Sequence, residues 1–220
     1  MKISKETIAI LQNFSTINNS LYTFEENILS TKTPNSSNII GVAKIAETLP
    51  ELSIYSLDEL LGSLSLFEQD KIDYTFTDQY IKMKAGKMKI NYRLSDPEHI
   101  LTKCQPSEKY EAFKEFDASF KLTVEQLNNI QKAARILKAD VVSFNIKDNE
   151  GTINLINSQL PLDNSFELKI QGEGTAKLSL FVDNLMIINS NYTVLVADEK
   201  VIKFMSDDIP VYYFCSPAVL

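Results

Sequence analysis

The sequence predicts an α+β protein built from two similar domains. Its 220 residues are 44% hydrophobic and 23% charged, which is ordinary for a globular protein. Each half, at about 110 residues, is long enough to bury a core of its own. Both halves show the same order of elements: a long amphipathic helix, several strands, a short helix and three further strands. A repeat of roughly 110–120 residues is too long for a solenoid, so we expect two copies of one α+β domain, at 1–108 and 109–220.

In the first half, the apolar residues of 4–17 recur at helical spacing and predict an amphipathic helix. Ser56 and Glu59 have the spacing of a capping box, which predicts the start of a short helix at 57–67. Short alternating runs bounded by turn residues predict strands at 21–24, 38–45, 51–56, 71–77, 79–85 and 87–94.

In the second half, Thr123 and Gln126 have capping-box spacing and predict the start of a helix at 124–138. A short helical turn is expected near 183–188. Strands are expected at 141–147, 151–157, 165–171, 176–182, 191–197, 200–206 and 211–216. Residues 95–118 have mixed charge, two prolines and no sustained period, so we interpret them as a connector between the domains, with a final strand or turn near 110–116.

The residues that catalysis or metal binding would need are scarce. His99 is the single histidine, and Cys104 and Cys215 form neither a CxxC pair nor a Cys/His cluster. There is no phosphate-binding loop or dinucleotide fingerprint, and the acidic pair Asp207-Asp208 is interpreted as solvated. We therefore expect a protein that is not an enzyme and has no metal or cofactor.

The chain also lacks the pattern of a membrane protein. No apolar run reaches the ~18 residues of a spanning helix, and the opening MKISKETIAILQ carries polar and charged residues inside its apolar run, unlike a signal peptide. We expect a cytoplasmic protein without a membrane partner.

Positive charge is concentrated on the outer faces of the two long helices. The formal net charge is -7, which repels nucleic acid on average. Both helices nevertheless present basic or neutral residues on the face opposite their apolar stripe. Amides, hydroxyls and cations of this kind suit contact with phosphates without reading bases. The predicted DNA-binding residues are Lys2, Lys5, Lys132, Arg135 and Lys138.

Three segments resemble the DNA polymerase sliding clamps, or processivity factors, of T-even-type bacteriophages. They are MKISKETIAILQNFSTIN at the start, SIYSLDELLGSLSLF around the short helix, and LTVEQLNNIQKAARIL at the second long helix. The basic positions of the family's second-domain helix fall on Lys132 and Arg135, whereas Gln12 stands where the family has a basic residue late in the first helix.

The resemblance implies a sliding-clamp fold and a ring. Two similar clamp domains per subunit and three subunits head to tail would put the helices around a central hole and the antiparallel sheets outside. Duplex DNA would thread the hole in a sequence-independent manner, and the ring would tether the replicative polymerase for processive synthesis. The implied partners are double-stranded DNA, the DNA polymerase, a clamp loader and the other subunits of a homotrimer, in the cytoplasm of an infected host cell. Contact with late-transcription factors is left open.

The resemblance also implies two contact sites. Subunits would pair through the edge strands 87–94 and 165–171, with a charge bias from Lys87, Lys89 and Arg93 toward Glu167. A partner-peptide pocket beside the connector is expected from Ile39, Ile100, Leu101, Tyr213, Cys215 and Pro217. Tyr213 and Cys215 share one face of their strand, and the alternative is that they close the core of the second domain.

Two other functions remain alternatives at this point. One is a β-rich, ring-forming structural protein of a virus particle, and the other is a hydrolase whose site is not visible in the sequence. Basic helix faces at equivalent positions favour the clamp, because a particle protein has no need of them. A closed ring with a helix-lined hole of duplex size would support the clamp alone.

Overall fold

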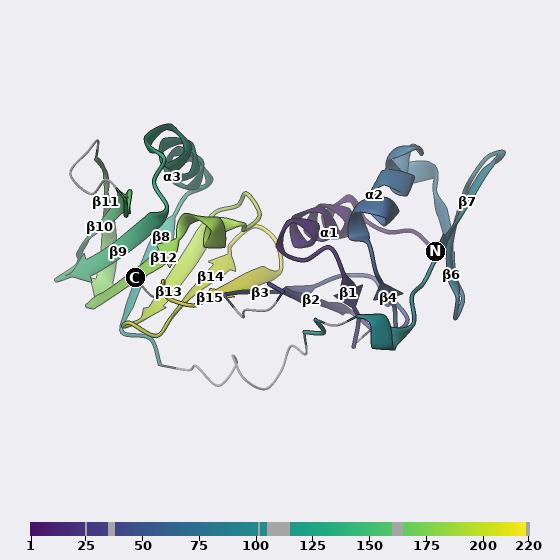
Figure 1. Ribbon diagram of the computed structural model, residues 1–220, viewed down its shortest axis with the longest axis horizontal. Helices are drawn as coiled ribbons and strands as arrows, with labels where there is room; N and C mark the ends of the chain where they lie inside the picture. The colour runs from purple at the N-terminus through teal and green to yellow at the C-terminus, as the bar shows by residue number, and fades with distance from the viewer. Residues whose placement is uncertain (25, 35–37, 101, 105–114, 160–164, 219–220) are drawn as a thin grey trace. The chain divides into compact units, whose positions relative to one another are not determined.

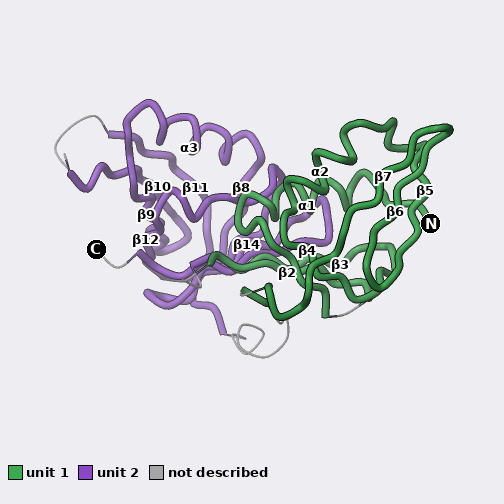
Figure 2. Tube along the Cα trace, turned by 45° about the vertical axis from the view of Figure 1, so that its right-hand side comes forward, with its two compact units in different colours: residues 1–36, 40–106 green, residues 37–39, 107–220 purple. Residues whose placement is uncertain are grey.

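The computed structural model describes residues 1–220 except 25, 35–37, 101, 105–114, 160–164 and 219–220 (Figure 1). The chain forms two compact units (Figure 2). Unit 1 consists of Met1–Ser36 and Ile40–Pro106, and unit 2 consists of Ser37–Ile39 and Ser107–Leu220. The order of elements confirms a mixed α+β chain with antiparallel sheets.

Unit 1 contains both helices predicted for the first half. α1 spans Lys5–Ile17, and the Ser4 side chain caps it by accepting a hydrogen bond from the Thr7 N–H at 3.1 Å. α2 spans Leu57–Ser65, and the Ser56 side chain accepts from the Glu59 N–H at 3.3 Å. α1 packs against α2 and β2, so its apolar stripe is buried, and Phe14 has no exposed area.

The strands of unit 1 form short antiparallel pairs and a three-stranded sheet. β1 pairs with β4, β2 pairs with β3, and the order of the third sheet is β5-β6-β7. Gly86, at φ +58°, lies in the turn between β6 and β7. Two 3₁₀ turns, η1 (Gln69–Lys71) and η2 (Pro97–His99), complete the unit. The strand bounds are β1 Leu21–Tyr22, β2 Ile28–Lys32, β3 Ile39–Lys44, β4 Ser53–Ile54, β5 Asp73–Phe76, β6 Tyr80–Ala85 and β7 Met88–Arg93.

Unit 2 is a larger antiparallel sheet with one long helix. The strand order within it is β12-β9-β10-β11-β8-β13-β14-β15, and α3 (Val124–Leu137) contacts β10 and the 3₁₀ turn η3 (Val182–Leu185). The Phe144 ring, packed between those of Phe120 and Phe204 at centroid distances of 5.8 and 6.3 Å, occupies the core. The strand bounds are β8 Ala118–Leu122, β9 Val141–Lys147, β10 Glu150–Ile156, β11 Phe166–Gly174, β12 Ala176–Phe181, β13 Tyr192–Ala197, β14 Val201–Ser206 and β15 Val211–Cys215.

Two strands depart from the sequence-based expectations. No strand was predicted at β2, where Ser30 and Thr31 are both buried, so the polar side chains hide the alternating pattern. β8 begins at Ala118, after the strand or turn expected near 110–116; residues 110–114 of that expectation lie outside the described residues. The remaining predicted strands are present, with ends shifted by a few residues, as local patterns allow.

Candidate nucleic-acid interface

α3 presents a polar and cationic face on a rigidly capped helix. Its N-terminus has both halves of the predicted capping box: Thr123 Oγ1 accepts from the Gln126 N–H at 3.2 Å, and Gln126 Oε1 accepts from the Thr123 N–H at 2.9 Å. The Val124 N–H donates to Asn191 Oδ1 at 3.1 Å. These three hydrogen bonds fix the N-terminus of α3, so they also fix the direction in which the helix presents its outer face.

The three predicted cations of α3 are exposed and free of ion pairs within the described part of the chain. Lys132 and Arg135 are three residues apart and therefore share a face, opposite the buried Leu127 and Ile130. Lys138 follows as the C-cap residue, in the left-handed conformation at φ 51°. With no carboxylate among the described residues within salt-bridge distance of them, their charge is available to an external anion.

The two predicted cations of unit 1 have partners in the protein itself. Lys2 Nζ donates to the Ile72 carbonyl at 2.8 Å and lies 3.2 Å from Asp73 Oδ1. Lys5 Nζ lies 3.4 Å from Asp70 Oδ2. Lys2 therefore anchors the start of the chain to β5. Since exposed ion pairs of this kind are weak and exchangeable, Lys5 retains much of its ability to attract an anion, whereas Lys2 is more restricted.

The rest of the outer face of α1 is neutral or acidic. Gln12 and Thr16 are exposed, and Glu6 is exposed in the first turn. The Thr16 hydroxyl donates to the Asn13 carbonyl at 2.7 Å. Of the two long helices, α3 thus has the more available positive charge. The difference arises because Asp73 and Asp70, which are distant in sequence, form ion pairs with Lys2 and Lys5.

The predicted pairing strands each have an open side among the described residues. β7 is the outer strand of its sheet and pairs with β6 alone. β11 pairs with β10 from Phe166 to Gln171 but meets β8 only at Gly172–Gly174. The charged residues expected there, Lys87, Lys89, Arg93 and Glu167, are all exposed. Unpaired N–H and C=O groups on an exposed edge are a template for another strand.

The predicted peptide pocket needs correction at two of its residues. Tyr213 and Cys215 have no exposed area. The Tyr213 hydroxyl accepts a hydrogen bond from the Ile188 N–H at 3.3 Å, and the Cys215 thiol donates one to the Asn184 carbonyl oxygen at 3.4 Å. Burial raises the pKa of both side chains. They complete the core of unit 2, which is the alternative that the sequence left open, and they offer no surface to a peptide in this conformation.

The other pocket residues are mostly buried too. Ile39 is 0% and Ile100 is 2% exposed, and Pro217 is half-buried. Leu101 lies outside the described residues.

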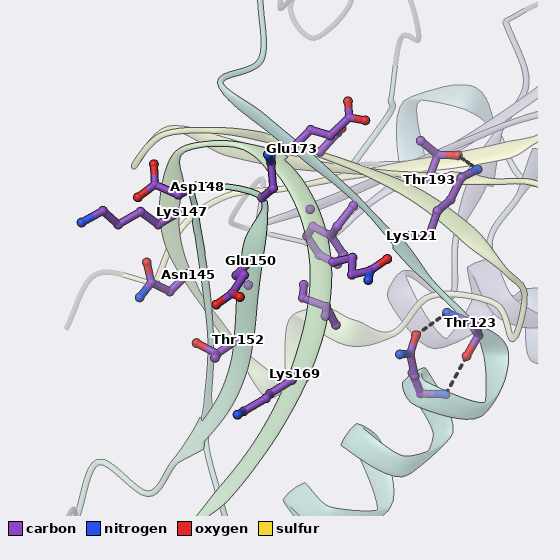
Figure 3. Close-up of a pocket in the computed structure, with 18 residues that line it drawn as sticks. Lys121, Thr123, Asn145, Lys147, Asp148, Glu150, Thr152, Lys169, Glu173 and Thr193 are labelled. Carbon is purple, nitrogen blue, oxygen red and sulfur yellow. Dashed lines mark hydrogen bonds between the residues drawn. The ribbon is translucent and has the colours of Figure 1, made fainter.

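A wide polar basin of about 1740 Å³, which the sequence did not reveal, lies where β8 and β11 diverge in unit 2 (Figure 3). Lys147, Lys169, Asp148 and Glu150 line it with mixed charge. At its other side Lys121 Nζ lies 2.9 Å from Asp207 Oδ2. Hydrogen bonds from Thr193 and Lys121 hold the pKa of Asp207 below its usual range. The pattern of balanced, exposed charges is typical of a solvated surface rather than of a catalytic centre.

In the part of the chain that the structure describes, no group of three or more His, Cys, Asp or Glu residues could hold a metal ion. Asp208 instead accepts hydrogen bonds from the Ser190 hydroxyl and the Asn191 N–H, both at 2.8 Å. Among the described residues, no helix is long and apolar enough to cross a membrane.

Comparison with known proteins gives the same picture in sequence and in fold. The family model for the DNA polymerase processivity factor matches residues 4–102. The sliding clamp of Enterobacteria phage T4 is 25% identical over 206 residues, covering 89% of this chain and 87% of that protein. The sliding clamp of Vibrio phage KVP40 is 24% identical over 229 residues, covering all of both chains. The structure of A. fulgidus PCNA with the C-terminal region of FEN-1 bound has a TM-score of 0.75 and 13% identity, covering 100% of this chain and 97% of that one.

The fold is that of the sliding clamps. Within that class, the resemblance to the clamps of T-even-type bacteriophages is confirmed by the similarity to the phage proteins along nearly the whole chain. The chain is thus similar to phage sliding clamps along nearly its whole length, and residues 4–102 match the DNA polymerase processivity factor family.

Proposed function

We propose that the protein encircles duplex DNA and tethers the replicative polymerase to its template. The observation that carries the proposal is the outer face of α3, where Lys132 and Arg135 are exposed without an ion pair in the described structure. The match to the processivity-factor family and the sliding-clamp fold support it. The alternative of a structural protein of a virus particle is not favoured, because the family match, the phage relatives and the fold all point to a sliding clamp.

A clamp must be attracted to DNA without being held in place. A few lysines and arginines provide attraction to phosphates that is independent of sequence and weakens as salt rises. The chain as a whole has a formal charge of -7, so most of its surface repels a duplex while the α3 face attracts one. This arrangement favours a mobile association over a tight one, and it requires no catalytic residue.

The functional assembly is proposed to be a homotrimeric ring. Strand addition between the open side of β7 and that of β11 in the next subunit would pair the backbone groups of both edges. The exposed Lys87, Lys89 and Arg93 would favour the register that brings them near Glu167. The helices would then line the hole.

Other proteins are proposed to reach this ring through short peptides. The bound C-terminal region of FEN-1 on A. fulgidus PCNA supports such a contact, and the polymerase and a clamp loader are the expected partners here. Contact with late-transcription factors belongs to the same proposal. The site of action would be the cytoplasm of the infected host cell.

The test is processive synthesis on a primed circular template. The variant Lys132→Glu/Arg135→Glu should shorten the products made per binding event while leaving the fold intact. Lys177→Glu/Lys200→Glu, which reverses two exposed lysines of unit 2, is the matched control. Equal product lengths for the parent and the α3 variant at ordinary salt would overturn the assignment of α3. The mass of the native oligomer, with and without circular DNA, tests the ring itself.

A further inference from the structure

The β6–β7 hairpin of unit 1 carries a concentration of positive charge that DNA encirclement leaves unused. Residues 80–93 contain five basic residues and no acidic one, in a chain with a formal charge of -7. The five are Lys82, Lys84, Lys87, Lys89 and Arg93.

Four of these cations share one face of the three-stranded sheet. Ile81 and Met83 of β6 are buried, so the alternating Lys82 and Lys84 project from the opposite face. Lys84 lies directly opposite Lys89 in the register of β6 and β7. Arg93, opposite Tyr80, has the same facing. We call Lys82, Lys84, Lys89 and Arg93 the basic face.

The basic face is not neutralised within the described protein. Like charges directly opposite one another destabilise a sheet, yet Lys84 and Lys89 are paired in this way. Asp73, the residue of β5 opposite Lys84, lies with its Oδ1 3.2 Å from Lys2 Nζ. No described carboxylate lies within salt-bridge distance of the four cations. Folding of a single chain therefore gives no reason for the cluster. The proposed subunit contact would use Lys89 and Arg93, and it leaves Lys82 and Lys84 of β6 to another anionic partner.

We propose that the basic face docks an acidic, extended polypeptide segment of a partner protein. Alternate side chains of an extended chain are about 6.8 Å apart, and neighbouring strands are about 4.8 Å apart. Lys82 and Lys84 alternate along β6 and so have the spacing of about 6.8 Å. Lys84 and Lys89 lie on neighbouring strands and so have the spacing of about 4.8 Å. Carboxylates at alternate positions of a bound segment would match the row on β6, and Asn91 on the same face adds a hydrogen-bonding group.

The size of the basic face favours a peptide over duplex DNA. The six residues of β6 span only about 20 Å. Asp78 and Asp96 are exposed on either side of the hairpin in sequence, next to its Tyr80–Arg93 end. A duplex presents a phosphate charge every ~1.7 Å along its axis, so it would extend beyond the cations toward these carboxylates. A short acidic segment would not.

The position of β6 separates this proposal from subunit pairing. β6 is the middle strand of its sheet and is hydrogen-bonded on both sides, whereas the open side belongs to β7. Reversing Lys82 and Lys84 therefore changes the basic face without altering the exposed edge. Lys82→Arg/Lys84→Arg keeps the charge and serves as the matched control.

The experiment is a titration of a fluorescently labelled peptide of alternating Glu and Thr residues, followed by anisotropy. The parent and the arginine variant should bind it, and Lys82→Glu/Lys84→Glu should bind about tenfold or more weakly, because each 1.4 kcal/mol lost is a factor of ten. Failure of the parent to bind, or equal binding by the charge-reversed variant, would overturn the proposal.

The same variants titrated with a labelled short duplex, and their sedimentation masses, distinguish the other occupants. Loss of duplex binding in the charge-reversed variant, with peptide binding unchanged, would assign the basic face to DNA and overturn the proposal. A change of oligomeric mass in that variant would assign it to a second copy of the chain, with the same consequence. Unchanged duplex binding and mass, together with weakened peptide binding, support an acidic polypeptide partner.

Discussion

The Tyr92 hydroxyl joins β7 to the N-cap residue of α2 through both backbone groups of Ser56. It donates to the Ser56 carbonyl at 2.9 Å and accepts from the Ser56 N–H at 3.3 Å. Burial raises the pKa of Tyr92, although its hydrogen bond to Ser56 acts in the opposite direction. The hydroxyl thus holds the N-cap of α2 against the strand proposed to form the subunit edge.

Tyr92→Phe should lower the free energy of unfolding by about 1–3 kcal/mol, because it leaves the Ser56 N–H without its partner and the Ser56 carbonyl with the Leu60 N–H alone. Urea unfolding of the parent and the variant measures the difference. Tyr55→Phe removes the hydroxyl of a tyrosine that is 66% exposed and should change nothing. Equal midpoints for Tyr92→Phe and the parent would mean that water replaces the hydroxyl at no cost.

Tyr74→Phe should have the opposite effect. The Tyr74 hydroxyl is buried and has no hydrogen-bond partner among the described residues, and burial raises its pKa to about 12. Replacing an unsatisfied polar atom with hydrogen removes a desolvation penalty of about 1–3 kcal/mol. The free energy of unfolding should therefore rise in the same urea assay. A less stable Tyr74→Phe would show that the hydroxyl has a partner in solution.

Protonation of Glu47 should make unit 1 less stable in acid. Burial opposes its ionisation, but hydrogen bonds from Thr7 and Ser4 outweigh burial and hold its pKa below the ordinary 4.5. The Thr7 hydroxyl donates to Glu47 Oε2 at 2.6 Å, and the Ser4 N–H donates to Oε1. A carboxyl whose folded pKa is lowered stabilises the protein above its unfolded pKa, and this contribution is lost as pH falls through the folded pKa.

Glu47→Gln should therefore be less stable than the parent at neutral pH and approach it as the pH falls through the lowered pKa of the parent carboxyl, which then becomes protonated. Unfolding midpoints across the pH range provide the measurement. A stability difference that stays constant with pH would show that the charge of Glu47 contributes nothing.

Removing the α3 cations should reduce the salt dependence of DNA binding. Each phosphate contact contributes about 0.9 to the slope of log K against log salt. Lys132→Ala/Arg135→Ala should thus lower that slope by about 1.8 if both residues contact phosphates. Binding to linear duplex at several salt concentrations measures it, with Lys177→Ala/Lys200→Ala as the control. An unchanged slope would place the DNA elsewhere.

A proline in β7 should disrupt the subunit edge. Asn91→Pro removes an N–H from the open side of β7, because the N–H groups of Ile90 and Tyr92 face β6, so light scattering should report monomers. Glu167→Lys is a milder companion, which should weaken the trimer by placing like charges near Lys89, and Lys89→Glu in the same chain should restore it. Circular dichroism confirms that each variant folds. A trimer that survives all of these changes would point to another interface.

Local sequence patterns predicted the helices well because their caps and apolar stripes are local signals. The capping box of Thr123 and Gln126 marks the start of α3. β2 escaped prediction because the buried Ser30 hydroxyl donates to the Cys104 carbonyl at 2.6 Å, a partner 74 positions away. No local pattern reports a bond of that kind.

The candidate site was predictable to a similar degree. Exposure of Lys132 and Arg135 follows from the periodicity of a single helix. The ion pairs of Lys2 and Lys5 with Asp73 and Asp70 depend on how distant segments meet. The burial of Tyr213 likewise depends on what covers β15, and strand alternation alone cannot distinguish a covered face from a docking face.

Lys138 ends α3 in a backbone conformation that glycine adopts far more readily. At φ 51°, a lysine costs about 1–2 kcal/mol where glycine would be free of strain. The strained residue carries a cation at the C-terminal end of the outer face of α3. Stability favours glycine at this position, whereas the proposed contact with DNA favours lysine, so the two requirements select for different residues at the same site.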